Sequence, residues 1–467
     1  MTDKEHLSVL GYDDSFNRSM SLWSNFALGF TYLSPLVGVY SLFAVVLTIG
    51  GPPSIWWIVI VGGGQLLVAF VFGEVVSQYP IHGGIYPWTR RLWGRRYAWM
   101  AAWVYIWAMI VTITAVAEYG SGFAASLFGI EVTSTSTFLI TLAFLLVAFA
   151  INFSGTKSLA RVARIGLAAE LVGVIGLGLY LLLFQRQQGF DVFFNSMGTE
   201  GDGNYGTAFL GAALAGLFLF YGFEACGDVA EEVENPAKRI PLAMIMTILV
   251  GGVSALFAFG GYVLAAPNLA DSRLLFAFGR DEMLPGHRWL SKVSPTTKVP
   301  INALIVACSV PAIIALLVYL NGNLLVPVTA FAVIGIYIAF QMVVLAALRQ
   351  RMKGWRPAGP FSLGMAGYVI NIAALAWGVF AIILLAVPGS SGNFAADWVV
   401  LLGLGVVLGT GLLYLLIARP DRLPRDIGPS AAPLRRSAGG PFFLRCWALI
   451  ITESQALSER TWLAIAP

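Results

Sequence analysis

The sequence predicts an all-α polytopic membrane protein, and three features of the chain support that fold class. Hydrophobic residues make up 58% of the 467 residues and charged residues only 11%, whereas soluble domains carry about 25% charged residues. Apolar stretches long enough to cross a bilayer recur along the chain. The 51 glycines suit helix packing in lipid, where small residues let backbones approach each other closely.

The expected helices follow from the thickness of the bilayer. A hydrocarbon core about 30 Å thick requires roughly 20 apolar residues per helix. Residues 1–20 are polar and lack the apolar core of a cleavable signal peptide, so we expect the first span to direct insertion itself. The stretches that meet the requirement lie near residues 21–50, 55–78, 97–126, 134–153, 163–184, 207–231, 240–266, 299–320, 325–348, 363–388 and 394–417.

Basic residues predict how these helices are oriented. Lys and Arg collect in cytoplasmic loops, and they cluster here at 90–96, 157–164 and 238–239, after the second, fourth and sixth spans. The intervening loop 127–133 has none, and 185–206 has only Arg186. We therefore expect an integral, multi-pass protein of the plasma (inner) membrane with a cytoplasmic N-terminus, residues 1–20.

Two spans are interrupted by Gly, Pro and polar residues, at 26–38 in the first and 216–228 in the sixth. An interruption within the bilayer frees backbone N–H and C=O groups where no water can satisfy them. Breaks at matching positions of two halves are the best sequence pointer to the central site of a transporter. The alternative is that Gly and Pro merely kink these helices for packing, and the matching positions favour the binding interpretation.

Each break predicts a different part of a substrate site. Free N–H groups at 31–33, with a half-helix beginning near Pro35, would hold a substrate carboxylate. Carbonyls at 220–222 would accept from a substrate ammonium, and the aromatic rings beside the breaks would cover it or add cation–π contacts. The predicted substrate-binding residues are Thr31, Tyr32, Leu33, Ser34, Phe220, Tyr221, Gly222, Phe223 and Glu224.

Acidic residues inside spans are costly and usually functional. Glu224 lies in the second break, as an amine or proton partner or else as a structural acceptor for freed N–H groups. Glu118 either faces the same cavity or bonds a neighbouring helix. Glu170 is a proton site or, as we favour, makes a structural bond. Glu74 and Asp228 lie nearer helix ends, where pairing with loop arginines in gating contacts is expected.

Several function classes have no support in the sequence. There is no nucleotide-binding loop of the Gly-x-x-x-x-Gly-Lys-Ser/Thr type. The single cysteines Cys226, Cys308 and Cys446 form neither a disulfide framework nor a metal spacing. We therefore expect no enzyme activity, no cofactor or metal, and no nucleotide or nucleic-acid partner.

Three segments resemble the amino acid–polyamine–organocation permeases, most closely the branch of amino acid, GABA and choline permeases. They are 72–88 after the second span, 221–241 in and after the sixth, and 272–285. The resemblance implies a five-plus-five inverted-repeat fold with two extra C-terminal helices. It also implies that the first and sixth helices unwind around an amino acid or related amine.

The resemblance also implies a domain organisation and one departure from it. The first repeat would be 21–184, the second 207–348, and helices 11 and 12 would lie within 363–417. At 267–271 the chain lacks the loop and the front of the family's eighth helix, which would leave that helix truncated to about 271–284. The composition of 418–467 predicts a disordered cytoplasmic tail.

These observations predict a secondary transporter that moves an amino acid or related amine by alternating access. Its expected partners are the small-molecule substrate, the lipid bilayer and a possible coupling proton. The alternative is a membrane protein that binds substrate but does not complete transport, either a sensor or an inactive remnant.

Overall fold

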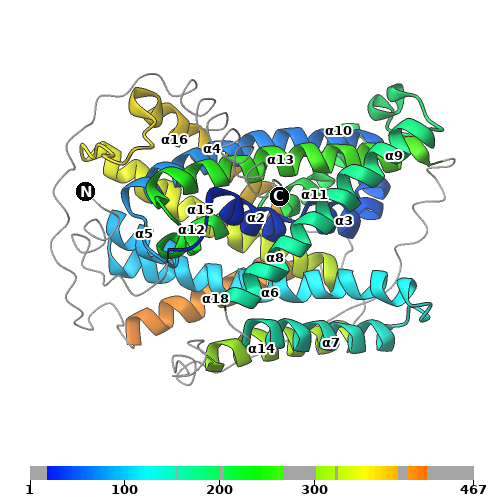
Figure 1. Cartoon of the computed structure of the whole chain (residues 1–467), viewed down its shortest axis with the longest axis horizontal. Helices are drawn as coiled ribbons and strands as arrows, with labels where there is room; N and C mark the ends of the chain where they lie inside the picture. The colour runs from blue at the N-terminus through cyan, green and yellow to red at the C-terminus, as the bar shows by residue number, and fades with distance from the viewer. Residues whose placement is uncertain are drawn as a thin grey trace, which may run out of the picture.

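The computed structural model describes residues 18–153, 156–199, 204–266, 301–320, 324–387 and 398–417. Within these ranges the chain is a bundle of helices (Figure 1), and the β-structure they contain is one isolated bridge between Met20 and Val233. The α-helices are α2 (Leu22–Leu33), α3 (Pro35–Gly50), α4 (Trp56–Gln78), α5 (Ile85–Leu92), α6 (Arg95–Leu127), α7 (Ser134–Phe153), α8 (Thr156–Glu170), α9 (Leu177–Phe184), α10 (Tyr205–Gly211), α11 (Ala213–Leu219), α12 (Ala225–Asp228), α13 (Pro236–Ala265), α14 (Ile301–Leu320), α15 (Leu325–Met352), α16 (Gly367–Leu385) and α18 (Val399–Ile417).

Nine helical segments of the described chain are apolar and long enough to cross a membrane. Two shorter apolar helices, Tyr205–Leu219 and Ala307–Leu320, fall where the sequence predicts the sixth span and the span at 299–320. The helix ends lie within a few residues of the expected bounds. The prediction of an all-α polytopic membrane protein is confirmed.

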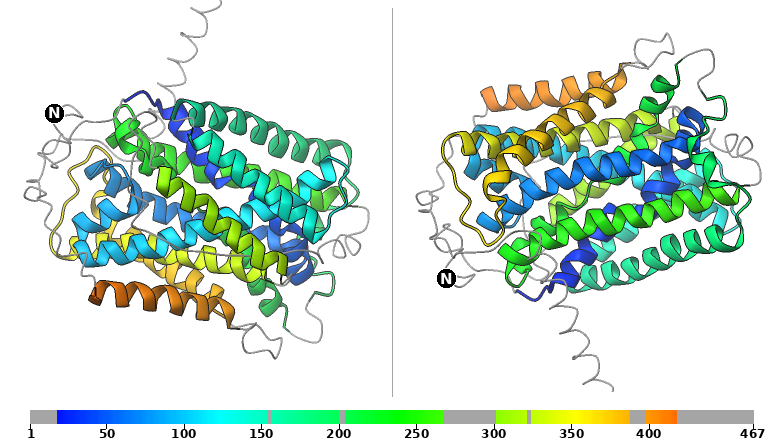
Figure 2. Two further views of the ribbon diagram at one scale, coloured as in Figure 1. Left: turned by 90° about the horizontal axis from the view of Figure 1, so that it is seen from below. Right: turned by 90° about the horizontal axis from the view of Figure 1, so that it is seen from above.

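The middle of the bundle is built from a few tightly packed helices. Helix α13 packs against α4 and α2, and α15 packs against α6 and α16. Helices α7 and α14 lie side by side, and α18 forms an edge of the bundle (Figure 2). The membrane segments of α13 and α15 are mostly buried, whereas those of α7 and α18 are mostly exposed, as expected of helices that face lipid.

The last turns of α4 bind the connection between α15 and α16 through its backbone. The Gln78 side chain accepts from Ala358 N–H at 2.6 Å, and Ser77 Oγ accepts from Phe361 N–H at 2.9 Å. Glu74 Oε1 accepts from Leu363 N–H at 3.0 Å. We call these three acceptors the α4 clamp.

Glu74 also forms a buried ion pair with Arg351, which lies in the last turn of α15. The two side chains are 1% and 6% exposed, so water contributes little to stabilising either charge. The Arg351 guanidinium also lies 5.6 Å from the centre of the Trp355 ring. One carboxylate therefore joins α4, α15 and the chain that leads into α16.

Backbone bonds tie together the end of the bundle that holds Met20. Met20 N–H donates to Glu232 O at 2.9 Å, and Glu234 N–H donates to Met20 O at 3.0 Å. Gly83 N–H donates to the Asp228 carbonyl at 3.0 Å. Burial raises the pKa of the Glu232 carboxyl, an effect that the charge of His82 partly opposes. The chain before α2, the loop after α4 and the chain after α12 are thus held together at this end.

At the opposite end, aromatic rings close the space between α3 and α13. The Tyr40 and Tyr262 hydroxyls are hydrogen-bonded, and the Phe43 ring lies edge-on to Phe259 with centroids 5.0 Å apart. The predicted short eighth helix at 271–284, the N-terminus before residue 18 and the tail at 418–467 lie outside the described residues. The division into two repeats stays a prediction.

Candidate substrate-binding site

The first interruption lies at Ser34. Helix α2 ends at Leu33 and α3 begins at Pro35, with Ser34 between them at φ 44° and ψ 80°, in the left-handed region. Ser34 is the N-cap of α3, since its side chain accepts from Val37 N–H at 3.3 Å. A serine N-cap followed by proline at the first helical position is a favoured start for a helix.

This geometry corrects the predicted role of Thr31, Tyr32 and Leu33. They form the last turn of α2, where N–H groups point back into the helix and carbonyls lack helical partners. The groups at 31–33 that face outward along the axis are therefore acceptors rather than donors. The expectation of free N–H groups placed the end of the helix several residues too early.

The start of α3 already faces an acidic side chain. The Ser34 hydroxyl donates to Glu170 Oε1, and the Leu36 N–H also interacts with this carboxylate. Glu170 is 7% exposed and ends α8, and the π-helical segment Leu171–Gly176 follows it. Such π-helical turns occur frequently at functional sites. Glu170 thus accepts a hydrogen bond at the first break, and the choice between a structural role and a proton site stays a prediction.

The second interruption extends over residues 220–224, between α11 and α12. Gly222 adopts φ +103°, a conformation that residues with a side chain rarely reach. Glu224 Oε2 accepts from Gly222 N–H at 2.8 Å, and the Glu224 side chain is fully buried. The Glu224 carboxylate thereby satisfies a backbone N–H that the break has freed. This is the structural role that the sequence left open for Glu224.

The two breaks touch each other. A Cβ atom added to Gly222 would lie 2.7 Å from the Leu33 nitrogen and 2.8 Å from the Tyr32 carbonyl carbon, so only glycine permits this approach. In the first turn of α2, the Asn25 side chain donates to Cys226 O at 2.9 Å. Helix α2 therefore lies along the second break and the start of α12.

One face of α6 lines this junction. Tyr105, Met109 and Thr112 are spaced by four and three residues, which places them on the same side of a helix. The Tyr105 hydroxyl donates to Glu224 Oε1 at 3.0 Å, and the Tyr32 hydroxyl donates to Met109 Sδ at 2.7 Å. Thr112 interacts with the Tyr221 phenol. The sequence analysis missed all three α6 residues, because nothing in a single sequence shows which face of α6 points at the breaks.

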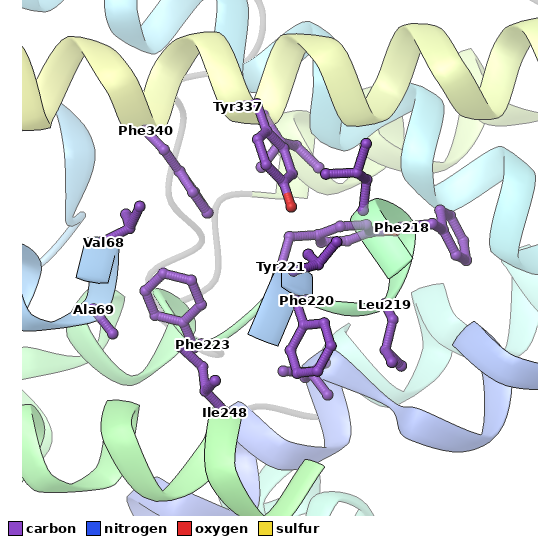
Figure 3. Packing of buried hydrophobic residues seen from close by; sticks show 14 of the residues in the cluster. Val68, Ala69, Phe218, Leu219, Phe220, Tyr221, Phe223, Ile248, Tyr337 and Phe340 are labelled. Atoms are coloured by element: carbon purple, nitrogen blue, oxygen red, sulfur yellow. The ribbon is translucent and has the colours of Figure 1, made fainter. Parts of the chain in front are cut away.

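Helices α4 and α15 supply a further polar pair that the sequence analysis missed. The Tyr337 hydroxyl points toward the second break (Figure 3) and lies near the Gln65 amide. Both side chains are fully buried, yet neither polar group makes a hydrogen bond of good geometry within the described chain. Buried polar groups rarely lack partners. These two are therefore available to a bound molecule.

Apolar rings cover the junction from the other side. The Phe223 ring packs against Phe340, with centroids 5.4 Å apart, and against Phe72 at 5.8 Å. Figure 3 shows Phe223 and Phe340 beside Tyr221 and Tyr337. Phe220 and Phe223 are fully buried, whereas Tyr32 is 42% exposed. The aromatic side chains around the junction are thus buried, except for the partly exposed Tyr32.

The charge around the junction is acidic. Asp228 acts electrostatically on Glu224, and both also act on Tyr32 and Tyr105. No lysine or arginine is among the described groups that act on Glu224. Like charges in a buried site repel each other unless a cation or a proton compensates them.

The remaining acidic candidates lie elsewhere or face the other way. Glu74 is bound to Arg351 and the α4 clamp, outside the junction. The Asp228 carboxylate lies against Gly84 in the loop after α4, so it acts on Glu224 from a distance. Glu118 is 7% exposed on α6, and Tyr119 beside it bonds Thr329 of α15. In the part of the chain that the structure describes, no His, Cys, Asp and Glu side chains group as metal ligands would.

Comparison with known proteins gives these features a family. The family model described as "Amino acid permease" matches residues 20–270 and 264–412. The two matches overlap at residues 264–270, in the region where the sequence analysis expects a departure from the family pattern.

Two curated relatives and one solved structure are similar to the chain over most of its length. The rice (Oryza sativa subsp. japonica) protein named "Amino-acid permease BAT1 homolog" is 25% identical, covering 83% of this chain and 88% of its own. The "Choline transporter" of Saccharomyces cerevisiae is 24% identical, covering 79% of this chain and 76% of its own. A crystal structure of the Eremococcus coleocola manganese transporter superposes with a TM-score of 0.51 at 13% identity, covering 87% of this chain and 98% of that one.

The solved structure shows the shared fold alone. The family and the curated relatives are transport proteins, which places the chain among membrane transporters rather than enzymes. Since the family match extends from residue 20 to residue 412, the chain belongs to the amino acid permease family.

Proposed function

We propose that this permease is a secondary transporter that moves an amino acid or a related amine across the membrane by alternating access. Its substrate would bind at the junction of the two breaks, among Glu224, Tyr105, Tyr221 and Tyr337. One observation carries the proposal. The two interrupted helices meet at Gly222, where the buried Glu224 carboxylate accepts from the Tyr105 hydroxyl at 3.0 Å and no described lysine or arginine acts on it.

The mechanism follows from the two ends of the bundle. Backbone bonds close the end that holds Met20, and aromatic rings close the end that holds Tyr40 and Tyr262. Alternating access would open one of these ends at a time around a substrate held between them. Glu224 and Glu170 are the carboxylates placed to carry a coupled proton. We place the protein in the plasma membrane with the Met20 end toward the cytoplasm, on the distribution of basic loops.

Uptake into proteoliposomes tests the proposal. The purified full chain should accumulate a radiolabelled amine or amino acid against its gradient when a pH gradient is imposed. Glu224→Gln keeps the shape of the side chain and removes its charge, so it should abolish this accumulation while the protein still inserts. Unchanged accumulation and unchanged pH dependence in Glu224→Gln would contradict the role of Glu224.

The departure at 267–271 supports the second candidate, a protein that binds substrate without completing transport. Such a protein would show saturable binding but no accumulation in the same vesicles. Accumulation above the external concentration would exclude this candidate.

A further inference from the structure

The substrate class can be narrowed by asking which backbone donors the two breaks still offer. At α3, Pro35 has no N–H and Gly38 N–H is bound to Ser34 O at 3.0 Å. Val37 N–H is bound to Ser34 Oγ, and Leu36 N–H faces Glu170. The first turn of α3, which would otherwise bind an anion, has its donors engaged by its own chain.

At the second break, the N–H of Gly222, the residue at positive φ, is bound to Glu224 Oε2. The Glu224 carboxylate lies on the same break, and the carbonyls at the end of α2 have no helical partners. Apart from the Gln65 amide, the groups described at the junction are thus acceptors, acidic groups and phenols.

We infer that the substrate is an organic cation without a carboxylate, and that Glu170 is the residue that excludes carboxylate-bearing ligands. This inference rests on the proposed function and specifies its substrate. The Glu170 carboxylate occupies the position at the start of α3 where a substrate carboxylate would bind. An incoming carboxylate has to displace it or lie beside a like charge, and both are unfavourable.

The cationic end of the ligand meets the opposite environment. Glu224 supplies a carboxylate that no described lysine or arginine acts on, and Tyr221, Tyr337 and Phe223 supply ring faces. Aromatic faces beside a carboxylate stabilise alkylammonium groups through cation–π attraction. Selection against the carboxylate and selection for the ammonium therefore come from two different elements, α8 and the second break.

The test uses two pairs of ligands that differ in a carboxylate: choline with glycine betaine, and putrescine with ornithine. Equilibrium binding is measured on the full-length protein in lipid nanodiscs. In each pair the member without a carboxylate should bind at least about ten-fold more tightly, the scale expected of one charge-assisted hydrogen bond. Glu170→Ala, which frees the Leu36 N–H, should reduce this ratio to near unity by improving the binding of glycine betaine and ornithine.

Two further variants make the result specific. Glu170→Gln keeps a bond to Ser34 without the charge and should give an intermediate affinity ratio. It replaces Glu170→Ala in the test if that variant does not fold. Glu131→Gln removes a carboxylate from the exposed loop before α7 and should leave the ratio unchanged. Thermal melts confirm that each variant is folded.

The inference is overturned if glycine betaine or ornithine binds as tightly as its partner, or if both Glu170 variants keep the wild-type ratio. Accumulation of amino acids in proteoliposomes with equal or better affinity than amines would overturn this inference and leave the proposed function standing. Absence of saturable binding of all four ligands to folded protein would overturn both.

Discussion

At the residue scale, Glu224 is held by donors from two different parts of the chain. Gly222 N–H binds one oxygen at 2.8 Å, and the Tyr105 hydroxyl of α6 binds the other at 3.0 Å. Two fixed donors set the direction in which the carboxylate points before any ligand arrives. Because the Glu224 side chain is already ordered, it loses less conformational entropy when a ligand binds, and the affinity for the ligand is higher.

Tyr105→Phe should therefore weaken ligand binding without unfolding the protein. A hydrogen bond to a charged group contributes about 1.5–3 kcal/mol, so the dissociation constant of the best ligand should rise by roughly ten-fold or more. Tyr97→Phe is the matched control, since Tyr97 lies two turns earlier on α6 and donates to Met342 O. Equal affinity in both variants would show that Tyr105 does not position Glu224.

The sequence predicts only some of these residues. Glu224 and Gly222 stand out because a carboxylate and a glycine interrupt an apolar run. Ser34-Pro35 is a favoured start of a helix, and this pair alone predicts that the first break lies at Ser34 rather than at 31–33. Tyr105, Gln65 and Tyr337 lie in uninterrupted helices, and their role depends on helix rotation and packing, which a sequence without an alignment does not show.

At the element scale, the contact between the breaks depends on a residue without a side chain. Gly222→Ala adds a methyl group 2.7 Å from the Leu33 nitrogen at a φ of +103°. A strained backbone of this kind costs about 1–3 kcal/mol, so the variant should melt at a lower temperature and lose ligand binding. Gly63→Ala is the control, because nothing lies within 4 Å of its Cβ position. Wild-type melting and binding in Gly222→Ala would contradict the close approach of the two breaks.

The buried pair between α4 and α15 gives a second prediction at this scale. Arg351→Met leaves Glu74 charged in a buried site, which should destabilise the protein by about 3–5 kcal/mol. Adding Glu74→Gln removes the stranded charge and keeps an acceptor for Leu363 N–H, so the double variant should melt closer to wild type. Thermal melts of the two variants in one detergent make the comparison. If the double variant is no more stable than Arg351→Met, the unpaired charge of Glu74 is not the cause of the destabilisation.

At the scale of the whole molecule, the positions of the spans could be predicted from hydropathy alone, because lipid imposes the length and composition of every spanning helix. Hydropathy does not show which helices pack against each other. Helix α13 lies against α4 and α15 lies against α6, and these pairs depend on side chains that are far apart in the sequence. The expected truncation of the eighth helix at 271–284 lies outside the described residues and stays a prediction.

Topology labelling tests the orientation of the whole chain. Single cysteines at Lys353 and Lys292, with Cys226, Cys308 and Cys446 replaced, should react with a membrane-impermeant maleimide only from the cytoplasmic side. Lys353 follows α15, whereas Lys292 lies outside the described residues and reports on the return crossing after 267. Labelling of Lys292 from outside the cell would mean that the return crossing does not occur.

The α4 clamp has a consequence for how the sequence of this permease can diverge. It binds the backbone N–H groups of Ala358, Phe361 and Leu363 and none of their side chains. The clamp therefore excludes proline at these three positions, because proline has no N–H to donate, but it places no demand on their side chains. Packing constrains two of those side chains, since Leu363 is buried and the Phe361 ring lies against Gly73 of α4. Pro360 already lies between two of the donors, and Pro357 precedes the first. Gly359 is fixed for another reason, because a Cβ atom there would lie 2.6 Å from the Ser77 carbonyl. Homologues should thus conserve the acceptors of α4 and Gly359, keep apolar residues at 361 and 363, and vary most at 358.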